Sequence, residues 1–200
     1  MAFIGMRHVV GALITSETAG SEPTYGASGS GFIIGKAITG NLTINRNDNP
    51  LRADDVIAED DNGITSMDLE LGLDDLMEDI QDKMGLLKAV TAGSPSVTTY
   101  YETSASAKAI GLGYIRVRRK NGATKYQAVW IYKAIFSKNS ENSQTKGEQI
   151  EWNTPTVNGR CFGLEIDSTG DVTYRKIQNF DNESDAATWL NGLANYTTSG

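Results

Sequence analysis

Few residues of this chain have the types and spacing that catalysis requires. Cys161 is the only cysteine and His8 the only histidine. A thiol nucleophile needs a neighbouring base or cation to lower its pKa, and His8 lies far from Cys161 in a strand-like apolar run. A Cys/His catalytic pair is therefore not predicted. One cysteine also supports neither an intramolecular disulfide nor a cysteine cluster for zinc.

Two loop-like segments have the composition of binding loops but lack the residues that binding needs. Residues 16–31 contain several glycines, yet a phosphate-binding loop would continue with Gly-Lys-Ser/Thr and a helix. Residues 47–63 are acidic, yet a calcium loop built around Gly63 would place Ala58 and Leu69 where carboxylates are required. Both segments are interpreted as long loops.

Adjacent carboxylates occur at three places in the sequence, and general acid/base chemistry often uses such pairs. They are Asp54-Asp55, Glu59-Asp60-Asp61 and Asp74-Asp75. Neighbouring acids are also common on acidic protein surfaces, and here no histidine or metal-ligand spacing accompanies them. We therefore predict no catalytic, cofactor-binding or metal-binding residue, and we expect that the chain is not an enzyme.

The stretch YIRVRRKNGATKY, at residues 114–126, gathers cations around one turn. Asn121-Gly122 predicts a two-residue type I′ hairpin loop, because both positions need positive φ. The loop length sets the register, so that Arg118 faces Lys125 and Arg116 faces Gln127. Alternate positions from Tyr126 to Phe136 are expected to form one apolar face.

This basic hairpin tip has two interpretations. Its cations can simply be solvated charges that protect a hairpin end. Alternatively, the tip contacts an anionic partner or nucleic acid. The chain has a net charge of −7, whereas duplex-binding domains are normally basic. The first 100 residues hold 6 Lys/Arg and 15 Asp/Glu, and the last 100 hold 12 and 10, so the halves can attract each other within or between copies.

The elements that would position these residues are mostly strands. Clean alternation predicts half-buried strands at residues 36–46 and 64–71. Apolar residues near the 3.6 period predict a helix from Leu73 to Met84, with Gly85 as its C-terminal cap. The stretch TPTVNG, at residues 154–159, is interpreted as a turn.

About eight strands, this clear helix and a marginal second helix from Ser184 predict one mainly β domain over residues 1–200, a sandwich or barrel. Loops are expected at about 16–31 and 47–63, and a flexible tail at about 195–200. The first residues have no basic n-region, and no run approaches the ~20 apolar residues of a membrane span. We expect a soluble protein made in a cytoplasm.

Four segments, in order, resemble a known family over roughly residues 4–174. They are IGMRHVVGALIT, ITSMDLELGLDDLMEDIQDKMG, GLGYIRVRRKNGATKYQAVWIYKAIFS and QTKGEQIEWNTPTVNGR. The family is the major tail tube protein of long-tailed, non-contractile bacteriophages of Gram-positive hosts. The basic hairpin and the KGEQIEWNTPT stretch are the most specific parts of this resemblance.

The resemblance implies a structural virion protein without cofactor. Its fold would be a β-sandwich or barrel with one flanking helix and long assembly loops. Copies would form six-fold rings that stack to build the hollow tail. The implied partners are further copies, the tape-measure protein and the tail terminator and tip proteins, while genome DNA passes through without specific binding. The implied location is the virion tail, assembled in the host bacterial cytoplasm.

A DNA conduit should not present a cationic wall, because cations hold the phosphate backbone. The outward faces of the two alternating strands are uncharged or anionic, and they predict the lumen wall: Asn41, Thr43, Asn45, Ser66, Asp68 and Glu70. The opposite charges of the tip and the acidic loop predict an inter-subunit contact: Arg116, Arg118, Lys120 and Lys125 with Asp54, Asp55, Asp60 and Asp61, or with the 74–82 helix.

Two alternatives remain open from the sequence. One is a nucleic-acid-binding module that uses the basic 116–125 hairpin and its interleaved tyrosines. The other is a different virion sandwich protein, such as a capsid decoration or tail-completion protein.

Overall fold

The computed structural model describes residues 2–47, 49–53, 56–61, 63–138, 154–167 and 169–197. Within these residues the chain is mainly β, with two helices and a nine-stranded antiparallel sheet. The predicted mainly β class is confirmed. The described residues contain fifteen strands rather than about eight, because several predicted loops hold short strand pairs.

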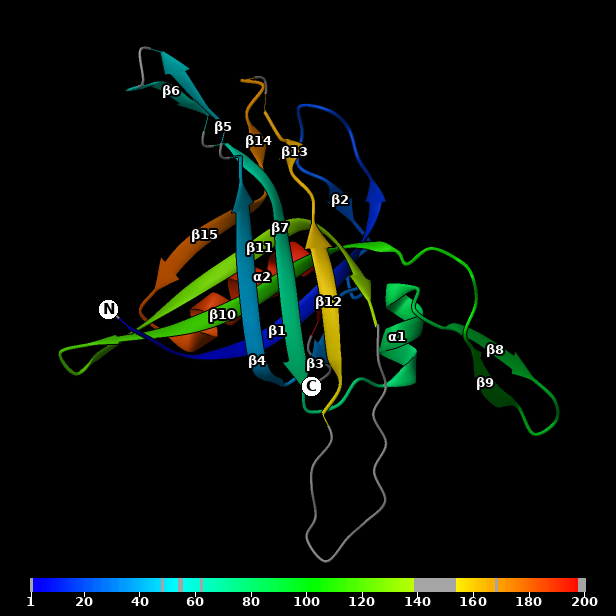
Figure 1. Cartoon of the computed structure of the whole chain (residues 1–200). Helices are drawn as coiled ribbons and strands as arrows, with labels where there is room; N and C mark the ends of the chain where they lie inside the picture. The colour runs from blue at the N-terminus through cyan, green and yellow to red at the C-terminus, as the bar shows by residue number, and fades with distance from the viewer. Residues whose placement is uncertain are drawn as a thin grey trace, which may run out of the picture.

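The large sheet folds into two layers (Figure 1). One layer consists of β4 (Ala37–Arg46), β7 (Ile64–Leu73) and β12 (Thr156–Cys161). The other consists of β1 (Ala2–Ser16), β10 (Ala109–Lys120), β11 (Ala123–Ser137) and β15 (Arg175–Phe180). β11 belongs to both, because residues 126–131 pair with β15 and residues 134–137 pair with β12.

The main hydrophobic core lies between these layers and continues the alternation seen in the sequence. Its members include Leu69 and Leu71 from β7, Leu112 from β10 and Ile131 from β11. Burying such side chains stabilises the fold by roughly 1.5–3 kcal/mol each. The core explains why the odd positions of β7 from Met67 to Leu73 are apolar.

A second core covers the outer side of β1, β10 and β11. Helix α2 (Glu183–Ala194) packs there through Ala186, Leu190 and Ala194, against Trp130 among others. The marginal second helix predicted from Ser184 therefore exists. The buried stripe at spacing four is what an amphipathic helix needs to cover a sheet.

The prediction that alternate positions from Tyr126 to Phe136 form one apolar face is wrong. Ala128, Trp130 and Tyr132 pack with α2, whereas Ala134 and Phe136 lie in the core between the sheets. The β10–β11 register shifts between Ile110 and Leu112, and an extra residue in a ladder moves all later side chains to the other face. The shift occurs where β11 passes from one layer to the other.

Helix α1 (Glu78–Met84) closes one end of the sandwich. Ile80 and Met84 join the main core, together with Leu76 just before the helix. Gly85 has φ 76°, the left-handed conformation predicted for this cap. The helix begins later than expected, because β7 continues to Leu73.

The predicted loop at 47–63 is corrected to a strand pair in its described part. β5 (Asn49–Ala53) pairs with β6 (Val56–Asp61). The Asn47 N–H donates to the Gly63 carbonyl at 2.8 Å, so the ladder between β4 and β7 continues into this hairpin. Ladder pairing outweighs the turn propensity of the many Asn and Asp residues.

Residues 16–31 are loop-like but closely attached to the body. Glu17 forms an ion pair with Lys133 at 2.7 Å, and Glu22 forms one with Lys176 at 2.7 Å. β2 (Thr24–Tyr25) and β3 (Phe32–Gly35) both pair with β1. The Tyr25 hydroxyl accepts from Trp130 Nε1 at 3.0 Å and donates to the Tyr132 carbonyl at 2.9 Å. The segment is thus ordered by contacts within one chain.

The start of the predicted tail is also attached. Asn195 caps α2, and its Nδ2 donates to the Gly26 carbonyl at 2.7 Å. Its own carbonyl accepts from the Gly29 N–H at 2.7 Å. Residues 198–200 lie outside the described residues.

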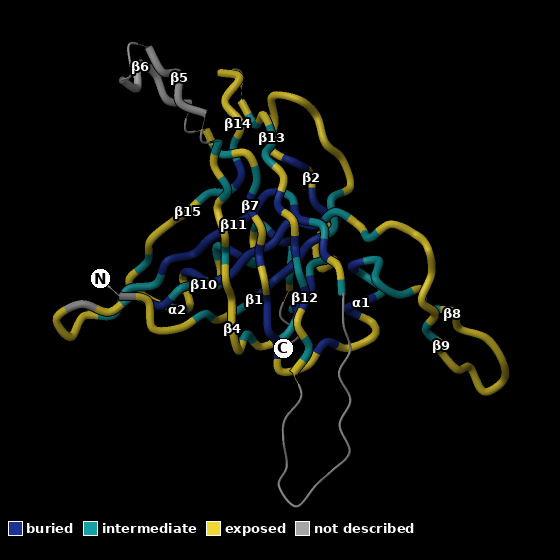
Figure 2. The backbone as a smooth tube through the Cα atoms, in the orientation of Figure 1, coloured by how far each residue is buried: buried dark blue, intermediate teal, exposed yellow. Residues whose placement is uncertain are grey.

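Two further strand pairs project from the body. β8 (Lys88–Ala92) pairs with β9 (Val97–Tyr101), and β13 (Leu164–Glu165) pairs with β14 (Val172–Thr173). In Figure 1 the β8–β9 hairpin extends sideways beyond α1. Figure 2 shows it exposed along most of its length.

Candidate functional site

The six predicted lumen residues lie together on one exposed face of β4 and β7. They are direct cross-strand partners: Asn41 opposite Glu70, Thr43 opposite Asp68, and Asn45 opposite Ser66. Their juxtaposition follows from the period-2 alternation of both strands. We call this group, with the residues added below from β12, the polar strand face.

Internal hydrogen bonds hold part of this face. Asn45 Nδ2 donates to Ser66 Oγ at 2.9 Å and to Asp68 Oδ2 at 2.7 Å. The Asp68 carboxylate therefore has a partner within the same surface. A carboxylate that accepts from a neighbouring amide is stable without a bound cation.

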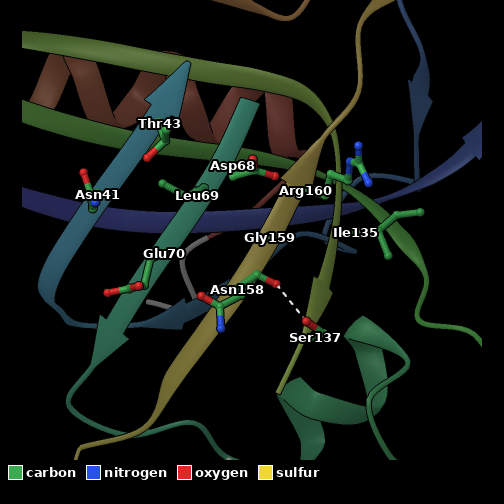
Figure 3. A pocket seen from close by; sticks show the side chains of 10 residues that line it. All are labelled: Asn41, Thr43, Asp68, Leu69, Glu70, Ile135, Ser137, Asn158, Gly159 and Arg160. Atoms are coloured by element: carbon green, nitrogen blue, oxygen red, sulfur yellow. Dashed lines mark hydrogen bonds between the residues drawn. The ribbon is translucent and has the colours of Figure 1, made fainter. Parts of the chain in front are cut away.

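β12 extends the polar strand face by one strand, which the sequence reasoning missed. Asn158 lies opposite Glu70, and Arg160 lies opposite Asp68. Figure 3 shows these side chains around a shallow hollow of about 370 Å³, at whose edge Ser137 Oγ donates to the Asn158 carbonyl at 3.4 Å. Residues 154–159 had been interpreted as a turn. The signal for the strand was the alternation of Val157, Gly159 and Cys161, which are all buried.

Beneath this face the core is tightly packed. Cys161 is buried there. Burial is the main cause that raises the pKa of its thiol to about 12, and the negative charge of the nearby Asp68 adds to it. His8 lies elsewhere, with its Nε2 2.7 Å from Asn191 Oδ1 on α2. The two residues therefore do not form a nucleophile and base pair. Within the described part of the chain, no three His, Cys, Asp or Glu side chains are arranged as a metal site.

The basic hairpin tip has the predicted register. Arg118 pairs with Lys125 and Arg116 with Gln127, and Asn121 and Gly122 have φ of 52° and 80°. Lys125 forms an ion pair with Asp181, which follows β15. The side chain of Lys120 lies outside the described residues.

The arginines of the tip are not free on the surface. Phe3 of β1 covers both guanidinium groups, with ring centroid distances of 4.1 Å to Arg116 and 5.2 Å to Arg118. Arg116 Nη2 donates to Gln127 Oε1 at 2.8 Å. The Nε atoms of Arg116 and Arg118 are buried without a hydrogen-bond partner. Burial is the main cause that lowers the pKa of Arg116, and the nearby Arg175 and Arg118 lower it further, against the opposing effect of Tyr114.

Arg116, together with Arg175 of β15, borders a groove at the open edge of the sandwich, where β1 and β4 approach each other. The groove has a volume of about 450 Å³. Apolar side chains from both strands and a few polar ones line it, among them Phe3, Met6, Ile38, Leu42, Ile44, Tyr114, Arg116 and Arg175. Ile38 remains 55% exposed and Ile44 36%. We call this feature the arginine groove.

The structure does not place the predicted acidic partners at the basic tip. Asp54 and Asp55 lie outside the described residues, and Asp60 and Asp61 end β6, whose side chains are not described. In the 74–82 segment, Asp74 Oδ1 accepts from the Lys36 N–H at 2.8 Å and Asp82 Oδ1 accepts from the Ala89 N–H at 2.8 Å. The predicted contact between copies stays a prediction.

No protein-family model matches the chain, and no curated protein matches it. Of the two helices in the described residues, neither has the length and apolar character needed to cross a membrane. The features of the chain that bear on function are the polar strand face, the arginine groove and the sequence resemblance.

Proposed function

We propose that this protein is a structural virion protein, the major tail tube subunit of a long-tailed, non-contractile phage. Copies assemble into rings, and the rings stack into a hollow conduit for genome delivery. The observation that carries this proposal is the polar strand face. Six residues selected from the sequence for a lumen wall lie side by side on two neighbouring strands.

The composition of the polar strand face suits a wall that DNA slides past. It presents amides, hydroxyls and two carboxylates, Asp68 and Glu70, with Arg160 as the one described cation among the residues that line its hollow. A cationic wall would hold DNA, because each phosphate contact that releases a counterion adds affinity. A face of this kind offers transient hydrogen bonds and mild repulsion.

The outer parts of the chain supply surfaces for contacts between copies. The β5–β6 and β8–β9 hairpins extend from opposite sides of the two-layer body (Figure 1). On β8–β9, Val90, Val97 and Tyr101 are 40%, 60% and 50% exposed. Two-stranded hairpins are marginally stable alone, so packing against another copy would stabilise them. On this proposal the tape-measure protein occupies the lumen during assembly, and terminator and tip proteins close the two ends.

Electron microscopy of the purified protein tests the proposal. We expect rings or tubes with a central channel, assembling as the protein concentration rises. A particle that remains monomeric and shifts DNA in a gel would contradict it and favour the nucleic-acid module. Closed particles without a channel would favour another virion sandwich protein.

A further inference from the structure

The arginine groove contains positive charge that no carboxylate of the described residues neutralises. Among the described carboxylates, none lies within 4.0 Å of Arg116, Arg118 or Arg175. Arg116 is also close enough to the other two arginines for each to disfavour its charged form. Partly buried cations without an anion are unfavourable. The groove therefore suits an anionic occupant.

The edges of the groove are two strands with unused backbone groups. In the described structure, β4 pairs with β7 on one side and with no strand on the other. Between Ala2 and Arg7, β1 pairs only with β10 there, since pairing with β3 begins at Val9. Free edges of this kind accept an added strand, with backbone bonds giving affinity and side-chain sites giving specificity.

The groove walls are apolar as well as cationic. Ile38, Leu42 and Ile44 point into it from β4, and Phe3 and Met6 from β1. The exposed fractions of Ile38 and Ile44 are high for the apolar side of a sandwich strand. The occupant should consequently carry both apolar groups and carboxylates in an extended segment. Nucleic acid fits the charge but not these walls.

We propose that the arginine groove receives the β5–β6 hairpin of a second copy of this chain, with the acidic strand β6 against the free edge of β4. β6 has the sequence VIAEDD, three apolar residues followed by three acids. This composition complements the groove in both respects. The inference rests on the proposed assembly function and names the surfaces that one contact uses.

The hairpin of the same copy does not occupy its own groove. β5–β6 continues the β4–β7 ladder through the Asn47 to Gly63 hydrogen bond. Figure 1 shows it beyond the end of β4, directed away from the body. The contact therefore joins different surfaces of two copies. Head-to-tail contacts of this type produce closed rings or extended stacks rather than isolated dimers.

Charge exchange between copies tests the contact. In one variant the groove becomes acidic, with Arg116→Glu and Arg175→Glu. In a second variant the hairpin becomes basic, with Glu59→Lys, Asp60→Lys and Asp61→Lys. We expect each variant alone to assemble at least tenfold less well by sedimentation velocity, and an equimolar mixture to recover assembly. Circular dichroism establishes that both variants fold. Arg119→Glu is the matched control, since Arg119 is exposed and outside the groove.

A labelled peptide of residues 47–63 keeps the inference testable even if a variant fails to fold. We expect saturable binding to the wild-type protein by fluorescence anisotropy, weakened at least tenfold by neutralising Glu59, Asp60 and Asp61 in the peptide. Equal binding of the neutralised peptide, or no recovery on mixing folded variants, would overturn the proposed contact. Displacement of the peptide by a DNA oligonucleotide at equal charge concentration would also overturn it.

These results separate the groove contact from the tail tube function. Tubes that form regardless of the charge changes would leave the proposed function standing and remove the groove contact. Peptide binding with the expected charge dependence, in a protein that never forms rings or tubes, would support the contact and remove the tail tube function.

Discussion

The polar strand face and the arginine groove lie on either side of the same strand, β4, and differ in how their charges are satisfied. On the polar strand face, Asp68 accepts from Asn45 and lies opposite Arg160 in the next strand. In the arginine groove, the Nε atom of Arg116 is buried without a hydrogen-bond partner, as is that of Arg118, which shares the Phe3 ring with it. A surface with satisfied polar groups is suited to remain open, whereas an unsatisfied, partly apolar one is suited to be covered.

This difference assigns opposite tasks to the two sides of β4. Asn41 and Thr43 line the hollow on the open side, and Ile38, Leu42 and Ile44 line the groove, which Asn41 also borders. If the comparison is right, charge changes on the polar strand face should alter interactions with DNA and leave assembly intact. Changes in the groove should do the reverse.

The largest expected effect comes from making the polar strand face cationic. With Asp68→Lys and Glu70→Lys, we expect tubes to form normally but to retain double-stranded DNA at least tenfold more strongly, because lysines contact phosphates. Filter binding at several salt concentrations measures retention. Glu102→Lys with Asp171→Lys is the control, since both residues are exposed elsewhere. Equal retention by the two variants would show that this face does not line a channel.

The next largest expected effect is a loss of stability at high pH, caused by Cys161 in the core beneath the polar strand face. The folded-state pKa of Cys161 is about 12, above its ordinary value of 9.0, so the folded chain keeps a proton that the unfolded chain releases. This contribution to stability is complete below pH 9 and is lost as the pH rises further. At pH 10 the loss is on the order of 1 kcal/mol.

Urea unfolding of the wild-type protein and Cys161→Ala at pH 7.5 and pH 10 measures this loss. The wild-type protein should lose on the order of 1 kcal/mol more than the variant between the two pH values. Equal losses would mean that the thiol reaches solvent and that the core under this face is open.

Two substitutions, one in the basic hairpin tip and one on β4, should change the free energy of unfolding in opposite directions. Arg118→Met should stabilise the unassembled chain by about 0.5–1 kcal/mol, because it removes a like-charge pair with Lys125 and an unsatisfied Nε while keeping an apolar stem. Asn45→Ala should destabilise it by about 1 kcal/mol, because it removes two hydrogen bonds. Denaturant midpoints at low protein concentration compare them, and equal signs would contradict the difference between the two surfaces.

The smallest effect is expected at the exposed end of the basic hairpin tip. The side chains of Lys125 and Asp181 are 43% and 76% exposed, so their ion pair contributes little. Asp181→Asn should change the free energy of unfolding by about 0.5 kcal/mol or less at low salt, and by less still at high salt. A larger change would place this pair among the structurally important contacts of the tip.

Much of the local structure could be predicted from the sequence. The Asn121-Gly122 turn, the register of Arg118 with Lys125 and the cap at Gly85 all follow from backbone preferences of single residues. The six residues of the lumen prediction share a face because alternation in two adjacent strands is a local property. Pairing of β4 with β7 then brings the three residues of β4 next to the three residues of β7.

The missed elements depend on partners far away in the sequence. β12 was read as a turn because TPTVNG has strong turn propensity, yet β7 and β11 hold it on both sides. The face change at Phe136 results from a bulge that allows β11 to serve both layers. Residues 49–53 and 56–61 form a hairpin rather than a loop because they continue the hydrogen-bond ladder between β4 and β7. Tertiary pairing can override local propensity in each of these cases.

The sequence by itself determined the mainly β class, the charge asymmetry between the two halves, the turn of the basic hairpin and the composition of the polar strand face. Only the tertiary structure decided that the arginines lie under Phe3 at the edge of an apolar groove, and that Arg175 joins them from a separate strand. The physical reason is that composition and alternation are local, whereas desolvation of a charge depends on which distant strands surround it.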